Sequence, residues 1–569
     1  MTIATTPAAL RQAAPAERVI RDEWIARAGI ALLVLWLLVS IALPLWALLS
    51  KSFQSADGAF VGVANYVRYF STPALFGSIF NSIWVALVTT VIVIPAAFLY
   101  AFALTRSTMR FKGLFYALAL LPLFAPSLLS AISLIYLFGN QGLLKDLLAG
   151  ASIYGPIGIV VAQVFYCFPH ALIILVAALA LADARLYEVA EALGTSRVRV
   201  FRTVTLPGAK YGLINAAFVV FTLVVTDFGI AKVIGGQFNV LATDAYKQVV
   251  GQQNFEMGAV VGMVLLTPAV LAFVIDRLVQ RRQVALLSAR AVPLQPKPHA
   301  LRDAALIGYC LAIGGLIAIV LGVSVWASFI TYWPYNLSLT LRNYAFSTYD
   351  PEGWSSYFNS VAMAALAATF GTLVAFTGAY LVEKTKISLA GRAFAHLLAM
   401  LPMAVPGLVL GLGYVFFINA SWNPLNILYG TLIVLVVNSV AHFYTVAHIT
   451  ALTALKQIDP EFESVSASLK VPFWRTFARV TVPISLPAIL DIAIYMFVNA
   501  LTTVSAVIFL YGPATKLASI AIVHMDEAGS TSAAAAMATM IVATALGAKL
   551  LHILLDRVLF TRLQAWRKR

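Results

Sequence analysis

The chain has few charged residues and almost no cysteine. Of its 569 residues, 11% are Asp, Glu, Lys or Arg, and Cys167 and Cys310, both inside apolar runs, are its two cysteines. Soluble domains carry about 25% charged residues, so this scarcity argues against a soluble protein. Two isolated thiols also argue against a disulfide framework and against a thiolate metal site.

Sequence motifs of several enzyme classes are also missing. There is no GxxxxGK[ST] nucleotide-binding loop, no GxSxG nucleophile elbow and no HExxH helix. His170 and His442 have no second His, Cys or acid at metal-ligand spacing. A membrane enzyme acting on lipids would need a clustered catalytic constellation, which the sequence does not offer. We therefore predict no catalytic residues, no metal and no cofactor in this chain, which is not expected to hydrolyse ATP by itself.

Long apolar runs dominate the sequence. The chain is 61% hydrophobic, with a mean hydropathy of +0.91. The runs reach the ~20 residues that a helix needs to cross a bilayer, and they lack the alternation of an outer-membrane barrel. We predict an all-α polytopic membrane protein with about twelve transmembrane helices, six in each half. The predicted spans are 28–49, 80–104, 114–138, 155–181, 211–231, 258–280, 304–330, 358–382, 393–418, 428–455, 486–510 and 532–556.

The positive charges predict the orientation in the membrane. The net charge of +15 comes from short Lys and Arg groups beside the apolar runs, which favours a role in topology over nucleic-acid binding. These groups fall on one side, together with both termini, and that side is predicted to be cytoplasmic in a bacterial inner membrane. The run 28–49 is longer than the apolar core of a signal peptide, so we interpret it as a retained first span.

The two halves of the chain are repeats of each other. The triplet Phe80-Asn81-Ser82 returns as Phe358-Asn359-Ser360, and the pattern FxxVTxP that starts at Phe201 returns at Phe477 with nearly the same offset in numbering. This long period indicates duplicated domains, and six spans in each give both the same orientation. The predicted divisions are a cytoplasmic tail 1–27, a first repeat 28–285, a proline-rich cytoplasmic linker 286–303 and a second repeat with a basic tail, 304–569.

A charged loop follows the fourth span in each half. In the first copy, the spacing of Leu186, Val189, Leu193 and Val200 predicts two short amphipathic helices separated by a break at Gly194. Such helices can lie on lipid headgroups or dock on another protein. Duplication favours docking, because a twofold-related pair of surface helices suits a twofold-related partner.

This loop resembles the EAA loop of binding-protein-dependent ABC importer permeases of the MetI-like type. The resemblance implies the type I importer fold and a coupling helix that docks on a cytoplasmic ATPase. It also implies two ATPase copies, which would bind ATP and Mg, and a periplasmic solute-binding protein as a further partner. In the second copy Ser464 stands at the position of Glu188, and Lys470 stands at the position of Gly194. Glu463, one position before Ser464, offers a carboxylate there. The implied coupling residues are Glu188, Ala190, Gly194, Leu206, Pro207, Glu463, Ser464, Lys470 and Pro483.

Several segments suggest a solute by resemblance. LPLFAPSLLSAISLIYLFGNQG and TLVVTDFGIAKVIGGQFNVLATDAYKQV are most similar to 2-aminoethylphosphonate importers, with ferric-iron and polyamine permeases as competitors. A different class, an ion-coupled secondary transporter, can also have twelve spans. It would need intramembrane charges, for which Asp227 is the one obvious candidate, and it would not explain the duplicated loops.

Polar residues near the ends of the fifth spans are weaker candidates for the solute pathway. Asp227 could face the pathway or cap a helix end. The remaining candidates could line a passage or bond to neighbouring helices, and they are Thr222, Thr226, Asn499, Thr502, Thr503 and Ser505. Prolines at 122, 126, 402 and 406 interrupt both third spans and predict kinks.

Overall fold

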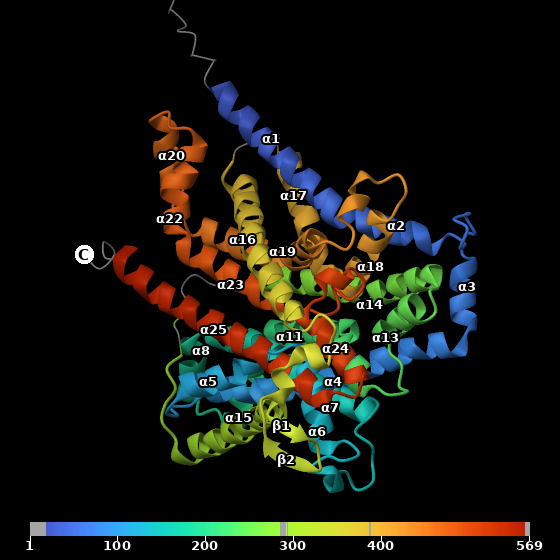
Figure 1. Cartoon of the computed structure of the whole chain (residues 1–569). Coiled ribbons are helices and arrows are strands. Elements are labelled where there is room, and N and C mark those ends of the chain that lie inside the picture. Colours follow the sequence, from blue (N-terminus) through green and yellow to red (C-terminus); the bar gives the residue numbers. More distant parts are fainter. Residues whose placement is uncertain (1–18, 285–291, 293, 386–388, 564–569) are drawn as a thin grey trace, which may run out of the picture.

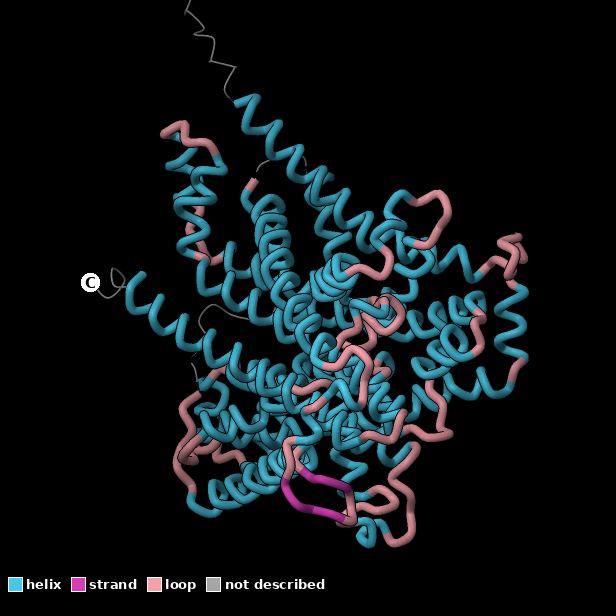
Figure 2. The backbone as a smooth tube through the Cα atoms, viewed as in Figure 1, coloured by secondary structure: helices cyan, strands magenta, loops and turns pink. Residues whose placement is uncertain are grey.

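The computed structural model describes residues 19–284, 292, 294–385 and 389–563. The described part is mostly helical, with one two-stranded hairpin (Figures 1 and 2). Eight helices are long and apolar enough to cross a membrane, and four bent pairs bring the number to twelve if each pair is one span. These features confirm the predicted all-α membrane fold. Residues 1–18 of the predicted tail, most of 286–293 in the linker, and the extreme C-terminus at 564–569 lie outside the described residues.

The elements of the first half follow the predicted spans. Its first part consists of α1 (Val19–Leu37), η1 (Leu38–Ala42), α2 (Leu43–Ser52), α3 (Ala64–Ser71), α4 (Pro73–Arg106), α5 (Lys112–Leu120), η2 (Leu121–Phe124), α6 (Ser127–Phe138), η3 (Lys145–Leu148) and α7 (Pro156–Ala180). Its second part consists of α8 (Ala184–Ala192), α9 (Arg197–Val200), η4 (Phe201–Thr205), α10 (Leu206–Gly208), α11 (Lys210–Thr226), α12 (Gly229–Ile234), α13 (Leu241–Tyr246), η5 (Lys247–Gly251) and α14 (Phe255–Val284).

The second half repeats this order. Its first part consists of α15 (Ala300–Ser328), β1 (Ile330–Tyr332), β2 (Asn336–Leu339), η6 (Arg342–Tyr344), η7 (Phe346–Thr348), α16 (Trp354–Lys384), α17 (Leu389–Met400), η8 (Leu401–Ala404), α18 (Gly407–Ile418), η9 (Pro424–Leu428) and α19 (Leu432–Lys456). Its second part consists of α20 (Glu461–Ser468), α21 (Phe473–Thr476), η10 (Phe477–Thr481), α22 (Val482–Ile484), α23 (Leu486–Thr502), η11 (Pro513–Thr515), α24 (Ala518–Glu527) and α25 (Thr531–Leu563).

The third span of each half is broken at its prolines. In the first half α5 gives way to a 3-10 turn with Pro122 at its second position, and α6 starts directly after Pro126. The two helical parts meet at 100°, and the equivalent parts of the second half meet at 113°. Proline lacks the N–H that a continuous helix needs, so both sites interrupt the helix at the same place. The predicted kinks are confirmed.

Equivalent residues make equivalent contacts in the two halves. The Asn-Ser pair near the start of the second span binds the backbone of the segment that precedes the sixth span. The hydrogen bonds are Asn81 Nδ2 to Asn239 O (2.9 Å), Asn359 Nδ2 to Lys516 O (3.1 Å), Leu241 N to Ser82 Oγ (2.8 Å) and Ala518 N to Ser360 Oγ (2.7 Å). The internal repeat is therefore a repeat of tertiary structure.

The first span of each half packs against the other half. In one direction α1 and α2 lie on α17 and α18, where the Tyr414 hydroxyl donates to the carbonyl oxygen of Ser40 (2.7 Å). In the other direction α15 lies on α4, α5 and α6, and Ser324 is hydrogen-bonded to Ser133 (2.6 Å). This reciprocal exchange is the arrangement expected of a pseudo-twofold pair.

Candidate functional site: two matched surface pads

The loop after the fourth span of the first half folds into a compact pad, residues 183–208, which we call the first pad. Asp183 caps α8, its carboxylate accepting a hydrogen bond from the N–H of Arg185 (3.1 Å). The helix ends where Gly194 adopts φ +63°, and the N–H of Thr195 donates to the carbonyl oxygen of Ala190 (3.0 Å). This is the left-handed C-terminal cap that glycine favours. The break predicted at Gly194 is confirmed.

The corresponding loop of the second half, residues 459–484, forms the second pad. Lys470 stands where the first pad has glycine, yet it takes the same left-handed conformation, with φ +54°. The N–H of Val471 donates to the carbonyl oxygen of Ser466 (2.9 Å), as in the first pad. The second pad therefore keeps the backbone of the first despite its divergent sequence.

Each pad exposes the same stripe of apolar side chains. Leu193 is 77% exposed, and Leu469, its counterpart in the second repeat, is 71% exposed. The other matched exposed pairs are Leu186 with Phe462, Val189 with Val465, and Val198 with Trp474. In Figure 1, α8 and α20 lie toward the left, near the end of α25, whereas α3 lies at the right. Two matching apolar faces on one side of the molecule suit a twofold partner.

The structure separates the predicted coupling residues into exposed and internal positions. Glu188 is exposed, and its side chain makes no ion pair or hydrogen bond within the described chain. Ala190, on the same helix, is buried. The other exposed positions are Gly194, Leu206, Pro207, Ser464, Lys470 and Pro483. Pro207 and Pro483 lie where each pad bends into the fifth span, at 61° and 77° respectively.

Glu463 is directed into the protein, toward Lys384 at the end of α16. Its carboxylate lies 3.2 Å from the Lys384 ammonium, which also donates to the carbonyl oxygen of Ile458 (3.1 Å). In the first pad the equivalent positions hold Tyr187 and Arg106, whose guanidinium lies 5.5 Å from the tyrosine ring centroid. One half therefore anchors its pad by an ion pair and the other by a cation–π contact.

The segment that joins the halves lies against the first pad. The Lys297 ammonium lies 2.6 Å from the Glu191 carboxylate, and the N–H of Ala184 donates to the carbonyl oxygen of Val292 (2.8 Å). The Arg197 guanidinium is hydrogen-bonded to the His299 ring (2.9 Å). These contacts leave Glu188 and the apolar stripe of the first pad exposed.

The candidate pathway residues of the fifth spans bond mainly to their own helices. The hydroxyls of Thr226 and Thr502 donate to the carbonyl oxygens of Thr222 and Val498, one helical turn earlier (both 2.9 Å). The amide of Asn499 does the same to Tyr495 (2.8 Å). These polar groups are thus satisfied within the helix, as is common inside membranes.

Asp227 acts as a cap between three helices. Its carboxylate accepts hydrogen bonds from the N–H of Ile230 at the start of α12 (2.9 Å) and from Gln163 on α7 (3.1 Å), and also from Ser127 on α6. This geometry agrees with the capping interpretation.

In the second half Thr503 is buried, and its carbonyl accepts from Ser519. Ser505 lies beside His442 near the start of α18. The described residues contain no group of three or more His, Cys, Asp or Glu able to hold a metal ion.

Residues 93–284 and 377–560 match the family described as "Binding-protein-dependent transport system inner membrane component". The two matches fall on equivalent parts of the two halves and together cover more than half of the chain. The chain belongs to this family. It is therefore the permease component of an ABC importer, and such permeases act with a separate ATPase and a substrate-binding protein.

The chain is similar to ferric and to spermidine/putrescine transport system permeases. The chain is 28% identical to the ferric transport system permease protein FbpB of Actinobacillus pleuropneumoniae, covering 82% of this chain and 68% of that protein. It is 24% identical to the Fe(3+)-transport system permease protein FbpB 2 of Haemophilus influenzae, covering 85% and 90%. It is also 25% identical to the spermidine/putrescine permease PotB of Haemophilus influenzae, covering 44% and 92%.

Sequence reasoning missed the residues that anchor this permease's pads. Arg106 and Lys384 end the second span of each half, and their offset in numbering is the same as that of the Phe-Asn-Ser repeat. That shared offset was a usable signal, because a cation kept at one position of both repeats needs a partner in each. The partner itself could be found only from the tertiary structure.

Proposed function

We propose that this permease couples to two copies of one ATPase, each docked on one pad, and that both pads and both chain termini lie in the cytoplasm. The matched apolar stripes of α8 and α20 are the observation that carries this proposal. The ATPases would bind ATP and Mg, and this chain would provide the solute pathway between its two halves.

The pads are built to pass motion into the membrane. Each continues through a short π-helical segment and a proline into the fifth span, so a displacement of α8 or α20 is transmitted to α11 or α23. The cation of the second span holds each pad from the other side. ATP-driven closure of the ATPases would draw the pads together and rock the halves between two states.

Two solutes are supported by different observations. Ferric iron is favoured by the names of relatives that align along most of this chain. 2-Aminoethylphosphonate is favoured by the resemblance of 121–142 and 222–249 to importers of that compound. A polyamine is a further alternative, named for relatives that align with a smaller part of the chain.

Charged substitutions in the stripes test the docking proposal. Leu193→Asp and Leu469→Asp place a charge in an apolar contact without disturbing a core, because both side chains are exposed. Each should reduce co-purification of the ATPase, and the double variant should abolish it. Val67→Asp, at an exposed position of α3 on the opposite side, is the matched control. Normal ATPase capture by the double variant would contradict the proposal.

Uptake into vesicles tests the energy source and the solute. We expect transport that needs ATP, the ATPase and the binding protein, and that continues after ion gradients are collapsed. Loss of transport with the gradients would instead support a secondary transporter. Labelled ferric iron and labelled 2-aminoethylphosphonate, supplied separately with the cognate binding protein, distinguish the two solutes.

A further inference from the structure

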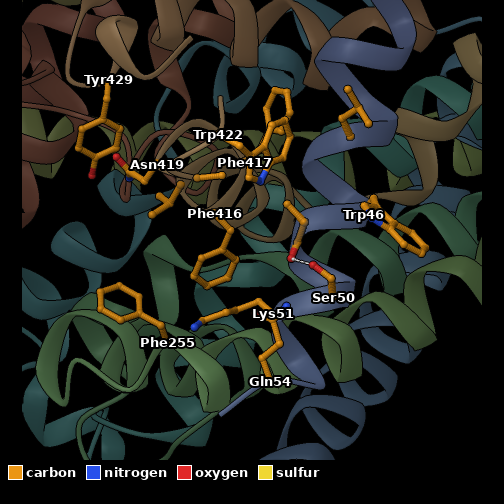
Figure 3. Close-up of a pocket in the computed structure, with 14 residues that line it drawn as sticks. Trp46, Ser50, Lys51, Gln54, Phe255, Phe416, Phe417, Asn419, Trp422 and Tyr429 are labelled. Carbon is orange, nitrogen blue, oxygen red and sulfur yellow. Dashed lines mark hydrogen bonds between the residues drawn. The ribbon is translucent and has the colours of Figure 1, made fainter. Parts of the chain in front are cut away.

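A pocket of about 710 Å³ extends along α2 to its C-terminal end, beside the start of α14 and the end of α18 (Figure 3). These helix ends lie on the side of α3, away from the pads (Figure 1). The pocket is on the outside of the first span and is separate from the candidate pathway residues of α11 and α23. It is not explained by solute transport or by ATPase coupling.

The lining changes from apolar to polar along α2. Leu43, Trp46 and Ala47 form one end, whereas Ser50, Lys51 and Gln54 form the other. The ten residues of α2 span about 15 Å, so the pocket is elongated along a membrane span. The facing wall is apolar at Val415, Phe416 and Phe417 and polar at Asn419. This gradient matches an amphipathic ligand aligned with the span.

A single ion pair forms the charged part of the polar end. The Lys51 ammonium lies 2.8 Å from the Glu256 carboxylate, and both side chains keep some exposure, 21% and 15%. Lys51 lines the pocket, and Glu256, which directly follows the lining residue Phe255, lies next to the lining as the partner of Lys51. The pair is neutral overall and offers one donor group and one acceptor group beside the pocket. A zwitterionic head group can bind both, its phosphate to Lys51 and its ammonium to Glu256.

The second half shows that the equivalent space takes an apolar group. The equivalence is set by matched hydrogen bonds, Ser52 to Tyr66 (2.8 Å) and Ser328 to Tyr344 (2.9 Å). The equivalents of Ser50 on α2 and Phe416 on α18 are Trp326 on α15 and Tyr136 on α6. Trp333, which follows β1, packs on both of their rings, with centroid distances of 5.7 and 5.3 Å.

Among the described residues, none fills the corresponding space between α2 and α18. The loop after α2 makes a single bridge, between Gln54 and Phe60. The loop after α15 instead forms the hairpin β1–β2, and Trp333 lies in this hairpin. The pocket is thus the open counterpart of the space that Trp333 fills between α15 and α6. Trp46 and Trp422 border it and are 66% and 71% exposed, as expected for tryptophans at a membrane boundary.

We propose that this pocket binds one zwitterionic phospholipid, with an acyl chain along Leu43, Trp46 and Phe416 and a head group at Lys51 and Glu256. The occupant is a lipid rather than a protein segment because the apolar end lies along the outward face of a membrane span. The neutral ion pair selects a zwitterionic head group over an anionic one. The bound lipid would complete the contact between α2 and α18, as Trp333 completes the equivalent contact between α15 and α6.

Ser50→Trp tests the proposal, because it narrows the pocket with the residue that the equivalent position, Trp326, carries. Native mass spectrometry of the full chain should detect one phosphatidylethanolamine that is retained more tightly than phosphatidylglycerol. Ser50→Trp should weaken this binding by about tenfold or more. Leu35→Trp, at an exposed position of α1 outside the pocket, is the control and should bind the lipid normally.

A photoreactive phosphatidylethanolamine with its label on the acyl chain supplies a second measurement. It should label the peptides containing 43–47 or 415–417 in the wild-type chain and not in Ser50→Trp. The double variant Lys51→Met/Glu256→Gln should abolish the preference for phosphatidylethanolamine. The proposal is overturned by equal binding to Ser50→Trp, by a preference for phosphatidylglycerol, by labelling elsewhere, or by crosslinking of the binding protein into the pocket.

Discussion

Lys232 on α12 forms an ion pair with Glu527 on α24, and its ammonium nitrogen also lies 4.8 Å from the ring centroid of Tyr246. The two helices belong to different halves, and each lies between the fifth and sixth spans. The contact therefore joins the halves across the pseudo-twofold axis, at the ends of the fifth spans opposite the pads.

Glu527→Gln is expected to loosen the halves on this side. Glu527 is about half exposed, so the ion pair contributes about 1 kcal/mol or less. A change of that size shifts a two-state equilibrium about fivefold. In the reconstituted complex without binding protein, basal ATP hydrolysis should rise by up to this factor. The charge-reversed double variant Lys232→Glu/Glu527→Lys should return it toward wild type, and unchanged hydrolysis in Glu527→Gln would contradict this role.

Lys516→Met is expected to destabilise the second half on the side opposite the pads. The buried Lys516 ammonium lies 2.6 Å from Asp350 and 3.0 Å from Glu352. Burial alone would raise the pKa of Asp350, but its hydrogen bonds, including those from Lys516, hold that pKa below its usual value. Removing the cation leaves a buried carboxylate unpaired, which costs about 3–5 kcal/mol.

The pH dependence of this variant follows from the sign of the shift. The folded-state pKa of Asp350 is depressed, so its stabilising contribution is present at neutral pH and is lost as the pH falls through the folded-state value. Without Lys516 the carboxylate can become neutral by protonation. The loss in thermal unfolding temperature should thus be larger at about pH 7.5 than at about pH 5. Lys145→Met, at an exposed lysine, is the control and should change little at either pH.

Glu463→Ala is expected to uncouple the second pad. The variant leaves the nearly buried Lys384 without its carboxylate partner, so α20 should become more mobile and ATPase stimulation should fall. Lys384→Arg/Glu463→Tyr installs the pair used by the first half and should recover most of the loss. Glu461→Ala changes a nearby exposed carboxylate on the same helix and is the control. Equal effects of the two alanine variants would argue against an anchoring role.

Gly194→Lys is expected to be tolerated, because Lys470 holds the same backbone conformation in the second pad. A Cβ at Gly194 would meet no atom within 4 Å, so the cost is conformational and about 1 kcal/mol. Gly194→Val adds branching at a left-handed residue and should cost more. Transport rates and thermal unfolding of both variants measure this difference. A Gly194→Lys variant that loses all coupling would show that glycine is needed for contact with the ATPase.

Features that repeat along the sequence could be predicted, and features that depend on partners across the fold could not. The twelve apolar segments and the proline breaks follow from local composition. The short elements α3, β1 and β2 have too few residues to leave a periodic signal. The predicted fifth spans extend to 231 and 510, whereas the helices end at Thr226 and Thr502. In the first half the early end depends on Asp227, whose donors come from α6, α7 and α12.

In the two pads, too, some features could be predicted from the sequence and others could not. The break at Gly194 was predictable because glycine favours positive φ, but the same geometry at Lys470 was not, because lysine rarely adopts it. The resemblance to the EAA loop implied that Glu463 offers a carboxylate for docking. Its partner Lys384 ends α16, a helix separated from the second pad by the whole of the third and fourth spans, and no local pattern reveals such a contact.

The exchange of first spans between the halves has a consequence for biosynthesis. While the first repeat is being inserted, α1 and α2 have no α17 or α18 to cover them, and α4 to α6 still lack α15. The early product is therefore an open intermediate whose inner surfaces contact lipid until α15, α17 and α18 of the second repeat have been inserted. For the same reason, severing the connection at 286–303 should yield fragments that mature only when they are synthesised together in one cell.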